Sequence, residues 1–135
     1  MGSSLALSQE QYFPLAHSCI LVVEDEFLIR MILSDSLRDA GYRVIEACNA
    51  DEALVILDTI LPDLIISDVR MPGSLDGMGL LAAIKLIRPM LPVIITSGHF
   101  QATQALAAGA DHFVPKPYKF GPMLKVVQDE LAIRQ

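Results

Sequence analysis

Residues 63–72, Asp-Leu-Ile-Ile-Ser-Asp-Val-Arg-Met-Pro, show the pattern from which the fold can be inferred, because an apolar run leads into a carboxylate and then into a turn. The run is continuously apolar rather than alternating, as in a strand that is covered on both faces. Similar runs recur along the chain, and the five expected strands are residues 19–23, 43–47, 64–68, 93–97 and 112–116. Amphipathic stretches follow the runs, which indicates repeated βα units around a parallel sheet.

The stretches after the strands carry apolar residues three or four positions apart, so each is expected to be a helix packed on the sheet. Gly41 is expected to end the first helix, and Asn49 with Glu52 is spaced as an N-cap with its reciprocal acid. The fourth helix is expected at about 101–108, and the fifth begins near Lys119. The expected inward-facing residues are Ile29, Leu33, Leu37, Ala40, Ala53, Leu54, Leu57, Leu80, Leu81, Ile84, Ile87, Met123, Leu124, Val127 and Leu131.

Composition limits the classes of protein that fit. A chain of 135 residues with 53% hydrophobic residues is expected to form one compact domain. The formal net charge of −6 disfavours direct DNA binding. No apolar run is long enough to span a bilayer and no basic, apolar leader begins the chain, so a cytoplasmic protein is expected. Cys19 and Cys48 are expected at opposite ends of neighbouring parallel strands, which is too far apart for a disulfide bond. Both are expected to be buried, reduced thiols.

Residues that can carry chemistry stand at the carboxyl ends of the expected strands, where ligands bind in a doubly wound sheet. Carboxylates crowded there would repel one another, and a hard divalent cation would offset the cost. The expected cation is Mg²⁺, with Mn²⁺ or Ca²⁺ as substitutes. Asp25, Asp68 and the backbone carbonyl of Arg70 are the expected direct ligands, with Glu24 nearby or acting through water.

A carboxylate beside Mg²⁺ can act as a nucleophile towards phosphorus, and Asp68 is the acid best placed for this. Lys116 would pair with the added phosphoryl group as a compact cation. The Ser97 hydroxyl would donate a hydrogen bond to that group. The three residue types together predict phosphoryl transfer.

These residues lie in motifs through which the sequence resembles the response-regulator receiver family. The motifs are Leu-Val-Val-Glu-Asp-Glu at 21–26, the stretch at 63–72, Asp76-Gly77, Pro-Val-Ile-Ile-Thr-Ser-Gly at 92–98, and Ala-Gly-Ala-Asp-His-Phe-Val-Pro-Lys-Pro at 108–117. The resemblance covers nearly the whole chain, from Cys19 to Leu131, and the motifs occur in the order of the family. Each motif alone is weak, but the set is specific.

The resemblance implies roles for individual residues and a class of partner. It makes Asp68 the phosphoacceptor, Glu24 and Asp25 the acidic pair, Ser97 the switch hydroxyl, Phe113 the switch aromatic and Lys116 the phosphate-binding lysine, with a cis peptide at Lys116–Pro117. The implied phosphoryl donor is a sensor histidine kinase or a histidine phosphotransfer protein in a two-component phosphorelay. The output is a contact with a downstream protein, and neither DNA nor a membrane is an expected partner.

Pattern and resemblance together predict an α/β fold. We expect a three-layer, flavodoxin-like (βα)5 doubly wound parallel sheet with strand order 2-1-3-4-5. Residues 1–18 are expected to be a flexible N-terminal arm and residues 19–135 a receiver domain with no effector domain after it. A free-standing regulator and a piece of a hybrid kinase both fit this pattern.

Some features depart from the family. The loop at 71–77 has one residue more than the commonest form, and Pro115 is tolerable in the last strand only at a sheet edge. Arg70 and His99 stand where the family tunes the access of water to the acyl phosphate. This bulky pair predicts slow self-dephosphorylation.

Other interpretations of the same residues remain. A haloacid-dehalogenase-like, Mg²⁺-dependent phosphatase would use a similar set, but it usually has a second acid where this chain has Arg70. A nucleotide-binding module would need a glycine-rich turn in place of the acids at 24–26. A docking receiver that takes no phosphate is the third alternative. Taken singly, the acidic triplet also fits a solvated turn, Lys116 a surface cation and Phe113 a core aromatic.

Overall fold

The computed structural model describes residues 18–99 and 102–133. Its strands are β1 (Cys19–Val23), β2 (Arg43–Ala47), β3 (Leu64–Asp68), β4 (Val93–Ser97) and β5 (His112–Pro115). Its helices are α2 (Phe27–Asp39), α3 (Ala50–Leu57), α4 (Gly77–Ile87), α5 (Ala102–Ala107) and α6 (Phe120–Ile133). The arm expected at 1–18 lies outside the described residues, apart from Ser18, and stays a prediction.

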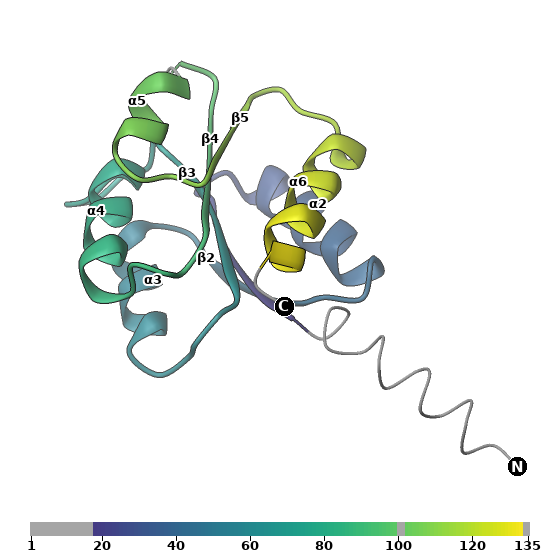
Figure 1. The fold of residues 1–135 in the computed structure, drawn as a ribbon, viewed down its shortest axis with the longest axis horizontal. Coiled ribbons are helices and arrows are strands. Elements are labelled where there is room, and N and C mark those ends of the chain that lie inside the picture. Colours follow the sequence, from purple (N-terminus) through teal and green to yellow (C-terminus); the bar gives the residue numbers. More distant parts are fainter. Residues whose placement is uncertain (1–17, 100–101, 134–135) are drawn as a thin grey trace, which may run out of the picture.

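The strands form one parallel sheet in the order β2-β1-β3-β4-β5. Helices α3, α4 and α5 cover one face of the sheet, and α2 and α6 cover the other (Figure 1). The expected three-layer α/β fold and its strand order are therefore confirmed. β5 is an edge strand, so the proline at position 115 removes no hydrogen bond from the sheet interior.

Alternate residues of the strands supply two separate cores, which explains why the strands are continuously apolar. Leu21 and Ile65 belong to the core under α3, α4 and α5, whereas Ile20 and Ile66 belong to the core under α2 and α6. Each of these side chains is at most 2% exposed. Both faces of the central strands are thus sealed, and only the strand ends are available to a ligand.

The helix boundaries follow local signals in the sequence. The Asn49 side chain accepts a hydrogen bond from the Glu52 backbone N–H at 2.7 Å, and the Glu52 carboxylate accepts one from the Cys48 N–H at 2.9 Å. This reciprocal pair satisfies donors that the first turn of α3 leaves free. Gly41 has a φ of 101° just after the end of α2, a conformation that favours glycine. Both expected boundaries are confirmed.

Several sequence predictions are wrong in detail. β5 ends at Pro115, so Lys116 lies just beyond the strand rather than in it. Ile87 is 66% exposed, because it is the last residue of α4 and lines an open groove instead of the sheet. Ala40 is exposed, because α2 ends at Asp39. α5 ends at Ala107, one residue before its expected end, and the expected first residue of that helix lies outside the described residues.

The two cysteines are free, as expected. Cys19 begins β1, and Cys48 follows the opposite end of β2, so the pleated strands separate them. Cys19 is buried, but Cys48 is only half-buried. The expectation of two buried thiols therefore holds for the first cysteine alone.

Candidate functional site

Four strand ends meet at one edge of the sheet and carry the candidate site. The strand register places Val23 opposite Ser67, Asp68 opposite Thr96, and Ser97 opposite Pro115. The acids that follow β1, the last residue of β3 and the lysine that follows β5 are therefore neighbours, although they come from distant parts of the sequence.

Three carboxylates come together at this edge. Glu24, Asp25 and Asp68 each offer an oxygen, and these oxygens lie within 4.8 Å of one another. Glu24 and Asp68 are buried, and Asp25 is half-buried. Oxygen donors at this spacing fit a hard divalent cation such as Mg²⁺, which favours carboxylate ligands.

Lys116 joins two of these acids. Its Nζ lies 2.8 Å from Glu24 Oε1 and 3.2 Å from Asp68 Oδ2. Burial alone would lower the pKa of Lys116, but its hydrogen bonds to the two carboxylates and their charges outweigh burial and raise the pKa. Lys116 therefore stays a cation in this site.

Glu24 has a partner for each of its carboxylate oxygens. Oε1 pairs with Lys116, and Oε2 accepts a hydrogen bond from the Glu26 backbone N–H at 3.1 Å. Burial nevertheless raises the pKa of Glu24, because it outweighs the hydrogen bond from Lys116. Of the two acids that Lys116 contacts, Glu24 is the closer, at 2.8 Å against 3.2 Å for Asp68, which favours a role for Glu24 through water over direct binding of a cation.

Asp68 is fixed by its own backbone and by its neighbours. Its Oδ1 accepts a hydrogen bond from the Val69 N–H at 2.8 Å, and its carbonyl accepts one from the Ser67 hydroxyl at 2.9 Å. The carbonyl also lies against Gly77, where an added Cβ would fall 2.0 Å from the oxygen. Oδ2 faces Lys116, so one oxygen of the carboxylate is hydrogen-bonded to the backbone and the other points into the site.

The other expected site residues surround this cluster. The Ser97 hydroxyl accepts a hydrogen bond from the His99 N–H at 3.1 Å, and Ser97 O accepts one from the Lys116 N–H at 2.9 Å. Phe113 is half-buried and packs against the core under α5. The Lys116–Pro117 peptide bond is cis.

The side chains of Arg70 and His99 border two different openings. Arg70 is exposed and lines a hollow of about 390 Å³ together with Asp25 and Asp76. His99 is exposed and lines a groove that also reaches Lys116. The two residues therefore flank the approach to the carboxylates from different sides.

Sequence reasoning missed the roles of two residues. Asp76 lies in the same hollow as Asp25, and its carboxylate accepts a hydrogen bond from the Gly79 N–H at 2.8 Å, which caps α4. Gly77 permits the close approach of α4 to the Asp68 backbone. The Asp76-Gly77 pair was recognisable as a family motif, but the spacing of residues along the chain does not reveal either contact.

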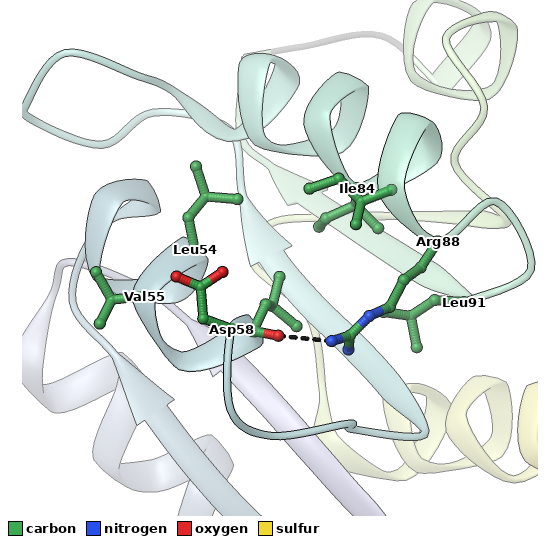
Figure 2. A pocket seen from close by; sticks show the side chains of 8 residues that line it. Leu54, Val55, Asp58, Ile84, Arg88 and Leu91 are labelled. Atoms are coloured by element: carbon green, nitrogen blue, oxygen red, sulfur yellow. Dashed lines mark hydrogen bonds between the residues drawn. The ribbon is translucent and has the colours of Figure 1, made fainter.

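A second hollow, between α3 and α4, is not part of this site. It has a volume of about 270 Å³ and is lined mainly by aliphatic side chains, including Leu54, Ile84 and Leu91. Figure 2 shows the Arg88 side chain reaching from α4 towards the end of α3. There its guanidinium donates to the Leu57 and Ile60 carbonyls, so this cation caps α3 and is not free for a ligand.

The comparisons with known proteins agree with this geometry. The response regulator receiver domain family matches residues 20–128, which is most of the chain. The chain belongs to this family. No helix in the described ranges, 18–99 and 102–133, is long and apolar enough to cross a membrane.

The relatives of this receiver domain are mostly longer proteins. The DNA-binding transcriptional regulator NtrC of Salmonella typhimurium is 38% identical over 116 residues, which are 84% of this chain and 24% of that protein. A putative NtrX-like response regulator of Rickettsia felis is 38% identical over 73% of this chain and 22% of its own. The chain thus spans about a quarter of the length of the curated relatives it matches.

Solved receiver structures have the same fold. The receiver domain of NtrX from Brucella abortus is 38% identical, with a TM-score of 0.80 over 84% of this chain and 98% of that one. The receiver domain of a Francisella response regulator is 25% identical, with a TM-score of 0.83 over 88% of this chain and 100% of that one. The family match favours a receiver over the phosphatase and nucleotide-binding alternatives.

Replacing Gly77 by alanine should destabilise the protein by about 2 kcal/mol, because the new Cβ would collide with the Asp68 carbonyl. Unfolding in denaturant measures this change. Gly98→Ala is the matched control, since an added Cβ there meets nothing closer than 3.9 Å, and it should change the stability by less than about 1 kcal/mol. Equal stability of Gly77→Ala and the wild type would contradict the close approach.

Proposed function

We propose that this receiver takes a phosphoryl group on Asp68 from a sensor histidine kinase or a histidine phosphotransfer protein. The main support for this proposal is the position of the Lys116 ammonium, which contacts both Glu24 and Asp68 at the strand ends. A bond forms between an Asp68 oxygen and phosphorus as the bond from phosphorus to the donor nitrogen breaks. The oxygen that points towards Lys116, Oδ2, is the candidate nucleophile.

A divalent cation fits the same cluster. Asp25, Asp68 and the Arg70 backbone carbonyl are the proposed direct ligands of Mg²⁺, with Glu24 holding it through water. Mn²⁺ or Ca²⁺ would be substitutes with the same preference for oxygen. The bound cation would screen the negative charge of the phosphoryl group as it approaches the carboxylates.

The added charge is proposed to change the protein surface. Lys116 would pair with the phosphoryl oxygens. The Ser97 hydroxyl, which accepts a hydrogen bond from the His99 N–H in the unphosphorylated protein, would turn to donate one to the phosphoryl group. Phe113 packs on the core beside β4, so a shift of Ser97 would reach it through the strand. The switch would thereby alter the surface of α5, β5 and α6, which a downstream protein would read.

DNA binding stays a separate question. The relative named NtrC is a DNA-binding regulator, but this chain spans only 24% of it. The net charge of −6 continues to predict that residues 1–135 make no direct contact with DNA. The proposed output of these residues is a contact with protein.

Incubation with acetyl phosphate and Mg²⁺ tests the phosphoacceptor. The intact mass should rise by one phosphoryl group in the wild type and stay unchanged in Asp68→Asn, because the amide keeps the shape of the carboxylate but is a poor nucleophile. Asp58→Asn, at an exposed acid after α3, should be labelled like the wild type. Labelling of Asp68→Asn, or of the wild type in excess EDTA, would contradict the proposal.

Removal of the two bulky side chains that flank the site should speed hydrolysis. We expect the phosphorylated Arg70→Ala, His99→Ala double variant to lose its label several-fold faster than the wild type, because water reaches the acyl phosphate more easily. The decay of the labelled mass after removal of the donor measures this rate. Lys125→Ala, on the exposed face of α6, is the control. Equal decay of the double variant and the wild type would show that the pair does not tune hydrolysis.

A further inference from the structure

One guanidinium joins α2, β2 and the turn that carries the acids. Arg30 Nη1 donates a hydrogen bond to the Glu24 carbonyl at 2.8 Å, and Arg30 Nε donates one to Glu46 Oε1 at 3.3 Å. The Phe27 ring lies over the same group, with its centroid 5.6 Å from the guanidinium carbon. The Arg30 side chain is only 16% exposed, so these bonds are partly shielded from water.

The carbonyl that Arg30 holds belongs to the peptide that joins Glu24 to Asp25. Because a peptide is planar, fixing the direction of its oxygen also fixes the direction in which the chain enters Asp25. The preceding N–H of this turn, on Glu24, is bonded to the Ala47 carbonyl at 3.0 Å. Arg30 and β2 together therefore set the orientation of the backbone just before Asp25.

Asp25 is the acid that most needs such support. Glu24 and Asp68 are each held by Lys116 and by a backbone N–H, whereas the described residues provide no hydrogen bond or ion pair to the Asp25 carboxylate. A half-buried ligand with a free carboxylate depends on its backbone for its direction. A fixed direction reduces the entropy that is lost when the ligand binds a cation.

We propose that Arg30 is a positioning residue for the metal site, which holds the Glu24–Asp25 peptide so that Asp25 presents its carboxylate to Mg²⁺. Glu46 supports this role by holding Arg30 from the side of β2. The inference rests on the proposed function, since it concerns the affinity of the same site for its cation. It adds a residue that is outside the acidic cluster and touches neither cation nor phosphoryl group.

A purely structural role for Arg30 predicts something different, and Arg38 separates the two. Arg38 is on the same helix and pairs with Glu46 Oε2 at 3.1 Å, and it donates to the Val44 carbonyl at 3.1 Å. It makes no contact with the acidic turn in the described residues. If the arginines only fastened β2 to α2, loss of either would affect the site alike.

The test is the affinity of the unphosphorylated protein for Mg²⁺, measured from backbone amide shifts in NMR spectra during titration with MgCl₂. Arg30→Gln should raise the dissociation constant roughly tenfold, at the low end of the effect of supporting residues on metal affinity. Arg38→Gln should leave it within about twofold of the wild type, because its loss does not release the turn. The spectra without Mg²⁺ show whether each variant is folded.

Arg30→Lys provides a second variant. Lysine keeps the charge but offers no planar fork, so it can serve the carbonyl or Glu46 but not both in the same geometry. Its dissociation constant should lie between those of the wild type and Arg30→Gln. If Arg30→Gln does not fold, a rise for Arg30→Lys supports the inference and the wild-type value overturns it.

The outcomes distinguish this inference from the proposed function. Wild-type affinity in folded Arg30→Gln, or equal weakening in the Arg30 and Arg38 variants, would overturn the positioning role and leave the metal site intact. A wild-type protein that does not bind Mg²⁺ at Asp25 and Asp68 would overturn the proposed metal site and the inference with it. Selective weakening in Arg30→Gln supports both.

Discussion

The ion pair of Lys116 with Glu24 and Asp68 is the interaction on which the site depends. Carboxylates within 4.8 Å of one another repel strongly in a partly buried place, and one shared ammonium offsets that repulsion. Lys116 directly follows the edge strand β5, and its backbone N–H is bonded to the Ser97 carbonyl at the end of β4. This bond holds the lysine where its side chain can reach both acids. The pairing of β4 with β5 therefore controls the charge balance at the ends of β1 and β3.

The sequence predicts much of the fold because each strand is a continuous apolar run and each helix has its own spacing. The start of α3 was predictable because Asn49 and Glu52 form a local capping pair. Predictions failed where an element ends, as at Ile87, which has apolar spacing but lies beyond the cover of the sheet. The predicted end of the last strand was wrong by one residue for a related reason, since the strand ends at Pro115 and does not include Lys116.

The acids of the site were predictable because parallel strands of similar length deliver their ends to one edge. Their supporting contacts were not, because they depend on tertiary distances that leave no periodic signal. Arg30 stands three and seven residues before Leu33 and Leu37, so its spacing places it beside the packed face of the helix without identifying a partner, yet it binds the Glu24 carbonyl. Gly77 reads as part of a turn, yet it lies against the Asp68 backbone. Such contacts become visible only when the acids, their turn and the neighbouring elements are placed together.

A crystal structure of the unphosphorylated protein grown with Mg²⁺ would show how the acids and Lys116 share the site with a cation. One ion should be bound by the carboxylates of Asp25 and Asp68 and by the Arg70 carbonyl, with Glu24 still paired to Lys116. An ion bound directly by Glu24 with Lys116 displaced, or no ion between Asp25 and Asp68 at saturating Mg²⁺, would contradict this arrangement.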